Sequence, residues 1–248
     1  MLFSIDQGVN STLEFQNAFF HSIRGSNYKD GKAMVFSDQN GNFWLWKNTR
    51  FSSLIHEIIV AFLAEELEIS VPKSMVAKRE QSIGLIQEWI DNTVELNNFT
   101  SSCPNIRNHE DLLSLVIFLA WIGAKDRHGG NYLYSDGKIY AIDFEDSFST
   151  EVTGSELCLY FPWIKNSSKI KELTNRIRTR IDERNLIQKL ENSNEIINLK
   201  EDNRAKKALK EQLSRICYLL RHNQYNLEKI VEEYIKRSTS PTDCINLF

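Results

Sequence analysis

Short strand-like runs and one long helical pattern alternate in the N-terminal third of the chain. Apolar and aromatic residues cluster in runs as short as β-strands, whereas one longer segment repeats apolar residues every three or four positions. Asn40 and Gly41 separate the first two runs and are typical of a tight hairpin turn. The pattern predicts, in order, strands at 33–36 and 42–47, a helix over 52–67, and strands at 74–78 and 83–89.

The rest of the chain is predicted to be mostly helical, apart from one further hairpin. A polar connection over 92–108 leads to an apolar helix, and Asp136-Gly137 marks the turn of the hairpin. The predicted elements here are a helix over 109–122, strands at 132–134 and 139–142, and helices beyond Pro162 with a polar break at 192–203. These elements predict an α+β protein with two lobes, at 1–91 and 92–248, and 248 residues are enough to give each lobe a core.

Charge is distributed unevenly along the chain. The formal net charge is −3, which by itself predicts no affinity for nucleic acid or for a membrane surface. Residues 1–164 hold 12 Lys and Arg against 21 Asp and Glu, whereas residues 165–248 hold 18 against 12. Two interpretations of the basic C-terminal region stay open: a surface that docks a partner, and the solvated face of helices.

Cysteine spacing and hydropathy favour the cytoplasm. The four cysteines are far apart and form no C-x-x-C pair, which argues against a zinc site and a disulfide framework and favours a reducing compartment. The longest apolar run, 112–124, is too short to cross a bilayer about 30 Å thick. The N-terminus lacks the pattern of a secretion signal.

Three polar residues around the second predicted hairpin suggest phosphoryl transfer. Asp126 lies in the loop before the hairpin, Asn131 follows five residues later, and Asp143 follows the hairpin itself. One carboxylate can orient an attacking hydroxyl, while an amide oxygen and a second carboxylate can hold Mg²⁺ on nucleotide phosphates. Taken singly, Asp126 and Asn131 are ordinary turn residues and Asp143 an ordinary cap. Their joint spacing favours the functional interpretation.

The sequence from Asp126 to Phe144, D-R-H-x-x-N followed by I-D-F, resembles the catalytic core of the phosphoinositide 3-/4-kinase-like superfamily, including the bacterial HipA-like kinases. The resemblance implies a two-lobed protein-kinase-like fold and a kinase that uses ATP and Mg²⁺. It implies that Asp126 is the catalytic carboxylate and that Asn131 and Asp143 bind the metal. His128 would lie close to the transferring phosphate, where it either stabilises charge or braces the loop; Arg127 is expected to pair with a nearby carboxylate.

The resemblance extends to the first lobe by the order of its elements. Lys47, at the end of a strand, and Glu57, early in the next helix, match the pair that anchors the ATP phosphates in the family. The loop at 25–31 would cover the phosphates through backbone N–H groups, including those of Gly25, Ser26 and Asn27. A plain turn fits this loop nearly as well. Glu88 and Trp89 fall where the family presents backbone groups to adenine.

Two departures from the family pattern bear on activity and substrate. Glu145 stands where the family commonly has glycine, and Asp146 is a candidate for a second Mg²⁺ ligand. Residues 143–164 hold five acidic residues and no Lys or Arg, which disfavours a phosphoinositide lipid and favours a protein substrate. We therefore expect a kinase that phosphorylates Ser or Thr of a protein, with autophosphorylation included. The alternatives are a nucleotide-binding pseudokinase that serves as an interaction module, and a phosphotransferase for a small molecule.

Overall fold

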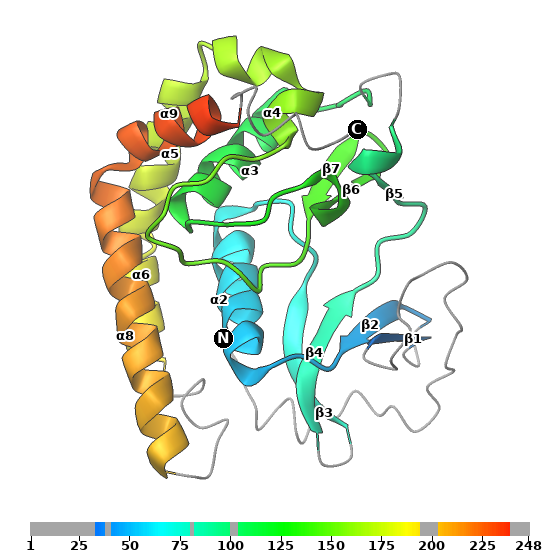
Figure 1. Ribbon diagram of the computed structural model, residues 1–248, viewed down its shortest axis with the longest axis vertical. Coiled ribbons are helices and arrows are strands. Elements are labelled where there is room, and N and C mark those ends of the chain that lie inside the picture. The colour runs from blue at the N-terminus through cyan, green and yellow to red at the C-terminus, as the bar shows by residue number, and fades with distance from the viewer. Residues whose placement is uncertain (1–32, 38–40, 80–81, 100–103, 194–202, 239–248) are drawn as a thin grey trace.

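The computed structural model describes residues 33–37, 41–79, 82–99, 104–193 and 203–238. It has a β-rich part that carries one long helix and a second part that is mostly helical (Figure 1). This arrangement is the α+β organisation predicted from the sequence. The predicted phosphate loop, with Gly25, Ser26 and Asn27, lies outside the described residues, and the division of the chain near residue 91 stays a prediction.

The β-rich part is built on a four-stranded antiparallel sheet in the order β1-β2-β4-β3. Its strands confirm the sequence prediction: β1 (Ala33–Ser37), β2 (Phe43–Lys47), β3 (Ser74–Arg79) and β4 (Ser82–Glu88). Gly84 on β4 accommodates the ring of Trp46 on the neighbouring strand. A Cβ atom at Gly84 would come within 2.7 Å of that ring, so the approach of the two strands requires glycine here.

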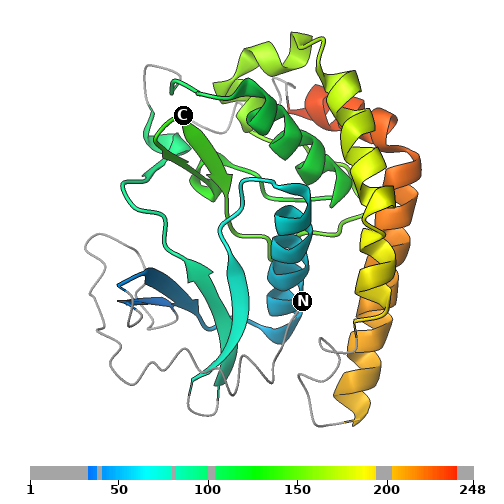
Figure 2. The same ribbon diagram turned by 180° about the vertical axis from the view of Figure 1, so that it is seen from behind.

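The helix α2 (Phe51–Leu67) packs against β3 and β4, so it lies between the sheet and the C-terminal helices in both views (Figures 1 and 2). Most of its residues are buried, and Glu57 is the buried carboxylate among them. The helix ends at Leu67 because Glu68 adopts the left-handed conformation with φ +60°, and the following N–H groups bond back to carbonyls of the last turn.

The second part begins with a buried helix and a small sheet. The helix α3 (His109–Trp121) is capped by Asn108, whose side chain accepts from the Glu110 N–H at 3.0 Å. The sheet has the order β5-β6-β7 and consists of β5 (Val94–Glu95), β6 (Tyr132–Ser135) and β7 (Lys138–Ala141). Asp136 and Gly137 join β6 to β7 with φ of +49° and +77°, which confirms the predicted hairpin turn.

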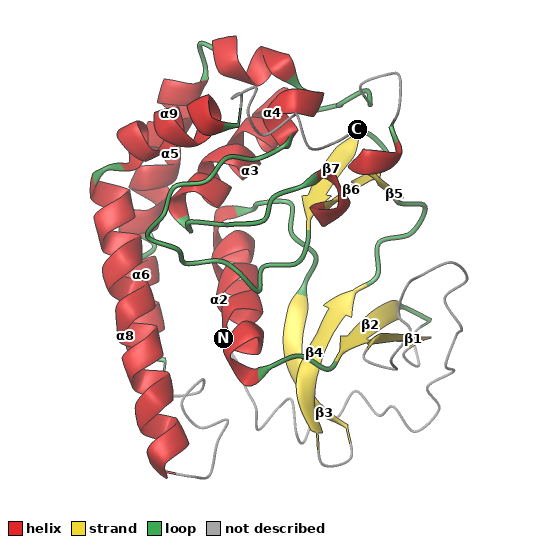
Figure 3. Ribbon diagram, viewed as in Figure 1, coloured by secondary structure: helices red, strands yellow, loops and turns green. Residues whose placement is uncertain are grey.

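The remaining helices are α4 (Leu157–Tyr160), α5 (Ile170–Glu183), α6 (Leu186–Glu191), α8 (Asn203–Tyr225) and α9 (Leu227–Arg237). Of these, α5, α8 and α9 pack against α3, whereas α6 packs against α5 and α8 (Figure 3). The Trp121 indole donates to the Leu220 carbonyl at 3.1 Å, and the Asn223 side chain donates to the Trp121 carbonyl at 2.7 Å. These C-terminal helices therefore complete the core of the second part. No helix in the described part of the chain is long and apolar enough to cross a membrane.

Part of the basic charge of the C-terminal region is neutralised by acidic residues from the N-terminal 164 residues. Arg180 on α5 pairs with Glu68 at 2.7 Å, and Lys189 on α6 pairs with Glu66 at 3.2 Å. Glu66 and Glu68 lie at the end of α2, so these pairs link the helical region to the β-rich part. Some basic residues of the C-terminal region therefore form ion pairs within the molecule and do not face solvent as free charges.

Candidate active site

Lys47 and Glu57 form the ion pair predicted from the sequence. Lys47 ends β2 and Glu57 lies in the second turn of α2, and their charged atoms are 3.5 Å apart. The Glu57 side chain is only 2% exposed. Burial raises the pKa of Glu57, Lys47 opposes that rise, and the charge of Asp143 adds to it. A backbone hydrogen bond from Phe144 also favours the charged form. The anchoring pair therefore lies against the segment that carries Asp143.

The loop after α3 presents Asp126 to solvent. Asp126 has φ +51°, a conformation uncommon outside glycine, and its side chain is 66% exposed. The Asn131 amide donates to the Asp126 carbonyl, and the Asn131 N–H donates to the His128 carbonyl at 3.0 Å. Asn131 is buried in a 3₁₀ turn over Gly129–Asn131. The loop is thus held by its own side chains in a conformation that leaves the carboxylate accessible.

The hydrogen bonds of His128 fix its tautomer. The Gly130 N–H donates to His128 Nδ1 at 3.1 Å, so Nδ1 carries no proton. In the neutral ring the proton is then on Nε2, which lies 3.9 Å from Asp126 Oδ2. His128 therefore directs a donor toward Asp126, the predicted catalytic carboxylate. This placement supports both roles left open by the sequence, charge stabilisation and bracing of the loop.

Arg127 is structural, but its partners are carbonyls and not the expected carboxylate. Its side chain is 3% exposed, and its guanidinium donates to the carbonyls of Ile142 and Asp143 at 2.8 and 2.5 Å. The guanidinium also lies 4.9 Å from the centre of the Phe144 ring. Every residue has a backbone carbonyl, so the sequence does not indicate which carbonyls accept from Arg127. Arg127 ties the loop of Asp126 to the segment of Asp143.

Asp143 leads a tight turn between the two parts of the site. It has φ +61° and an exposed side chain, whereas Phe144 beside it is buried. The Ile142 N–H donates to the Asn131 carbonyl at 3.0 Å, which brings the backbones of the two predicted metal ligands together. Asp146 is exposed, and its carbonyl accepts from the Lys125 N–H at 3.2 Å.

The donor set fits a magnesium ion that is shared with phosphates. Asn131 and Asp143 offer an amide and a carboxylate oxygen, which are ligands that Mg²⁺ prefers. Among the described residues, no three His, Cys, Asp or Glu side chains gather as a metal-binding group. Mg²⁺ on a nucleotide takes few protein oxygens and completes its shell with phosphates and water. The sparse set is therefore compatible with Mg²⁺·ATP.

Glu145, which stands where the resemblance predicts a glycine, forms contacts through both its side chain and its backbone. Its Oε1 accepts from the Thr49 hydroxyl at 2.9 Å, and its carbonyl lies 2.7 Å from His56 Nδ1 on α2. Burial lowers the pKa of His56, against the opposing effects of the Glu145 carbonyl and of the Asp146 charge. The sequence analysis missed Thr49 and His56. A polar residue beside Glu57 in the otherwise apolar stretch 54–64 was the available signal for His56.

Glu88 and Trp89 lie at the end of β4, and their N–H groups are used within the β-rich part. The Glu88 N–H donates to the Lys73 carbonyl at 2.8 Å, and the Trp89 N–H donates to the Phe43 carbonyl at 3.0 Å. Backbone recognition of adenine by these two residues would therefore rely on their carbonyls. Their role stays a prediction.

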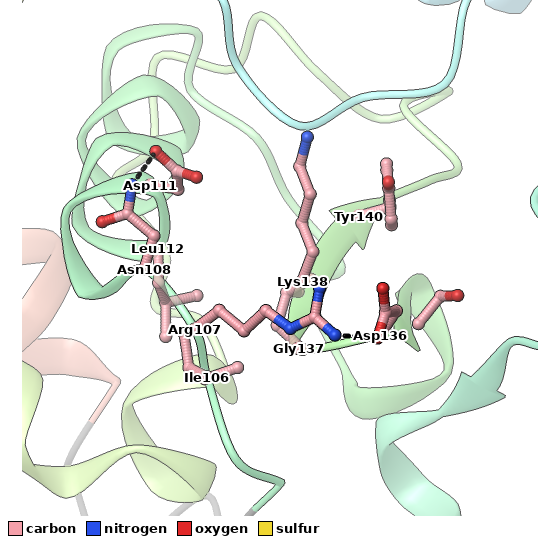
Figure 4. Close-up of a pocket in the computed structure, with 11 residues that line it drawn as sticks. Ile106, Arg107, Asn108, Asp111, Leu112, Asp136, Gly137, Lys138 and Tyr140 are labelled. Carbon is pink, nitrogen blue, oxygen red and sulfur yellow. Dashed lines mark hydrogen bonds and ion pairs between the residues drawn. The ribbon is translucent and has the colours of Figure 1, made fainter.

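A pocket of about 300 Å³ lies beside the β6–β7 hairpin (Figure 4). It is formed by the residues before and at the start of α3 and by the β6–β7 hairpin. Arg107 and Asp136 pair at its rim, and Lys138 lies over the Tyr140 ring. None of the predicted site residues lines it.

Comparison with known proteins indicates which fold the chain adopts. No protein-family model matches the sequence, and no curated protein matches it significantly. The structure is similar to that of the Helicobacter pylori proinflammatory kinase CtkA, with a TM-score of 0.53 at 13% identity, covering 94% of this chain and 98% of that chain. The fold is kinase-like.

Two further structures show weaker similarity. The Rio2 kinase of Chaetomium thermophilum, solved as an ADP/Mg²⁺-phosphoaspartate complex, matches with a TM-score of 0.42 at 15% identity, covering 93% of this chain and 74% of that chain. HipA from the toxin–antitoxin system of Shewanella oneidensis matches with a TM-score of 0.44 at 12% identity, covering 91% and 72%. At these identities the likeness concerns the fold alone. A specific relationship to phosphoinositide kinases is not confirmed.

Proposed function

We propose that the protein is an ATP- and Mg²⁺-dependent kinase that transfers the γ-phosphate of ATP to a Ser or Thr hydroxyl of a protein, itself included. The observation that carries this proposal is the junction between the Lys47–Glu57 pair and the segment Asp143–Phe144. Kinases need a phosphate-anchoring lysine and a metal-binding aspartate in place at the same time. Here the same buried carboxylate holds Lys47 and contacts the segment of Asp143.

In this proposal each residue has a defined task. Asp126, exposed in its loop, orients the hydroxyl of the acceptor and receives its proton. Lys47, held by Glu57, binds the α- and β-phosphates. Asn131 and Asp143 hold Mg²⁺, with Asp146 as a further candidate ligand, and the bound Mg²⁺ would neutralise charge on the phosphates. His128 donates from Nε2 beside Asp126.

The acceptor is proposed to be a protein and not a phosphoinositide. Around the catalytic loop the side chains of Asp126, Asp143, Glu145 and Asp146 are exposed, and Lys125 is paired with Glu151 at 2.6 Å. An anionic headgroup would approach this surface against Coulomb repulsion. A cytoplasmic location, which supplies ATP and keeps thiols reduced, is part of the proposal.

A substrate panel tests this proposal. The purified protein is incubated with γ-labelled ATP and Mg²⁺ in the presence of Ser- and Thr-containing basic peptides, or of vesicles that contain phosphatidylinositol. We expect label on the peptides or on the protein itself, and none on lipid. Preferential labelling of phosphatidylinositol would refute the choice of substrate, and bound ATP without transfer would favour the pseudokinase alternative.

We also propose that the outer face of α8 docks an acidic segment of a partner protein. Tyr218 and Tyr225 are 74% and 89% exposed on this helix, and they lie seven residues apart, two turns, on one face. The exposed cations Lys207, Lys210 and Arg215 form no ion pair with a carboxylate of the described residues, unlike the paired cations of α5 and α6. Tyrosine and basic residues are suited to an acidic protein partner. The excess of acidic residues in the first 164 residues would repel the long polyanion of a nucleic acid.

A further inference from the structure

His56 contacts two segments that are far from it in sequence. It precedes Glu57 on α2, and its two ring nitrogens lie in two different hydrogen bonds. Nδ1 is 2.7 Å from the Glu145 carbonyl oxygen, and Nε2 is 3.2 Å from Nε2 of Gln212 on α8. The ring thus lies between the proposed metal-binding segment and a helix of the C-terminal region.

The chemistry of these partners sets one tautomer. A carbonyl oxygen accepts and never donates, so the proton of the neutral ring must be on Nδ1. The other nitrogen, Nε2, is then an acceptor, and the Gln212 amide supplies the donor. The two bonds run in one direction, from Gln212 through His56 to Glu145. Each bond favours the tautomer that the other requires.

The acceptor of this relay belongs to the turn that positions the proposed metal ligands. Glu145 lies between Asp143 and Asp146 in the sequence, and Phe148 ends the turn with φ +63°. The Phe148 ring packs edge-on against the His56 ring with centroids 5.3 Å apart. The imidazole therefore holds the turn by a hydrogen bond and by ring packing at once.

We propose that Gln212 is a positioning residue that acts through His56, so that α8 sets the affinity of the active site for Mg²⁺·ATP. A neutral ring fixed with its proton on Nδ1 holds the Glu145 carbonyl, and that carbonyl restrains the adjacent carboxylates. Loss of the Gln212 donor frees the ring to adopt its other tautomer, which cannot bond the carbonyl. The affinity readout of this inference rests on the proposed kinase function; the tautomer does not.

The test compares Gln212→Ala with Gln224→Ala, a matched control. Gln224 lies on the same helix and donates to Asp182 at 2.7 Å, away from the active site. Binding of Mg²⁺·ATP is measured by calorimetry and stability by chemical denaturation. We expect Gln212→Ala to raise the Kd for Mg²⁺·ATP about 3- to 10-fold, the effect of one net hydrogen bond, and Gln224→Ala to leave it unchanged. An unchanged Kd for Gln212→Ala would overturn the inference.

A double-mutant cycle separates this role from a purely structural one. If Gln212 acts through His56, Gln212→Ala should have no further effect on the Kd in a His56→Leu background. Additive effects would contradict the relay. Gln212→Glu should keep near wild-type affinity, because a carboxylate accepts from a ring protonated on both nitrogens and Nδ1 still donates to Glu145.

Nitrogen-15 NMR of the histidine rings provides a readout that needs no activity. We expect the His56 signals of the wild type to show the proton on Nδ1, and those of Gln212→Ala to shift toward the Nε2 form. Signals that show the Nε2 form in the wild type would overturn the relay. A wild type with the expected tautomer but no affinity for Mg²⁺·ATP would instead refute the proposed function.

Discussion

Arg127 Nη2 donates to the Asp143 carbonyl at 2.5 Å and thereby joins the loop of Asp126 to the turn of the proposed metal ligands. The same guanidinium donates to the Ile142 carbonyl and lies over the Phe144 ring, so one buried side chain contacts three consecutive residues. A kinase site needs the loop and the turn in a fixed relation, because one orients the acceptor and the other the nucleotide. Arg127, which belongs to the D-R-H-x-x-N motif itself, fixes the loop relative to the turn.

Replacement of Arg127 by lysine is predicted to weaken both stability and nucleotide binding. A lysine ammonium cannot reproduce the planar guanidinium, whose Nη2 donates to both carbonyls while the group lies against the Phe144 ring. We expect Arg127→Lys to lower the free energy of unfolding by about 1–3 kcal/mol, as for loss of charge-assisted bonds in a buried site. Urea denaturation measures this, with Arg215→Lys on the exposed face of α8 as the control. Equal stability of the two variants would contradict the structural role of Arg127.

The Glu57 carboxylate is predicted to serve binding at the expense of stability. Burial raises its pKa in the folded state, so the native protein binds a proton more readily than the unfolded chain does. By linkage, this residue's contribution to stability falls as pH rises from the unfolded pKa through the folded one, and stays low above it.

Glu57→Gln should therefore be at least as stable as the wild type at pH 8, while its affinity for Mg²⁺·ATP falls because Lys47 loses its anionic partner. Denaturation curves at pH 5 and pH 8, with calorimetry at pH 8, measure both effects. A variant that is less stable at pH 8 and binds Mg²⁺·ATP normally would reverse this assignment.

Glu145 is predicted to stabilise its turn, although the sequence resemblance leads one to expect glycine at this position. We expect Glu145→Gly to lower the free energy of unfolding by about 1–2 kcal/mol, because it removes the Thr49 bond and adds backbone freedom. Thr49→Val should cost about 0.5–1.5 kcal/mol, because it removes only the bond. Neither variant should abolish phosphotransfer, since the His56 contact is to the Glu145 backbone. An inactive Glu145→Gly would show that the carboxylate itself has a part in the reaction.

The sequence predicts the site where local spacing carries the information. Asp126, Asn131 and Asp143 flank a hairpin whose Asp-Gly turn is visible in the sequence, so their proximity follows from local structure. Lys47 and Glu57 lie on neighbouring elements and form the predicted pair. The position of the C-terminal helices relative to α2 depends on packing over the whole molecule. The Gln212–His56 contact joins residues 156 positions apart, and no short sequence pattern predicts it.

Docking on α8 is predicted to depend on both its tyrosines and its cations. We expect a fluorescent Glu/Asp-rich peptide to bind the wild type with an affinity that falls with salt, and to bind Tyr218→Ala and Arg215→Glu more weakly. Lys171→Glu, an equal charge change at an exposed residue of α5, is the control. Equal losses in the control and in Arg215→Glu would mean general electrostatic attraction. Stronger binding of single-stranded DNA than of the peptide would assign the face to nucleic acid.

The most direct test of the account is phosphotransfer by the wild type against Asp126→Asn. The variant keeps the shape of the side chain and removes the charge that is proposed to receive the acceptor proton. Both proteins are incubated with Mg²⁺·ATP and basic Ser/Thr peptides and are analysed by intact mass, with calorimetry to confirm that both bind the nucleotide. The account predicts phosphoryl groups on the protein or the peptide for the wild type, and none for Asp126→Asn despite bound Mg²⁺·ATP. Equal transfer by the two proteins, or none by a wild type that binds Mg²⁺·ATP, would contradict it.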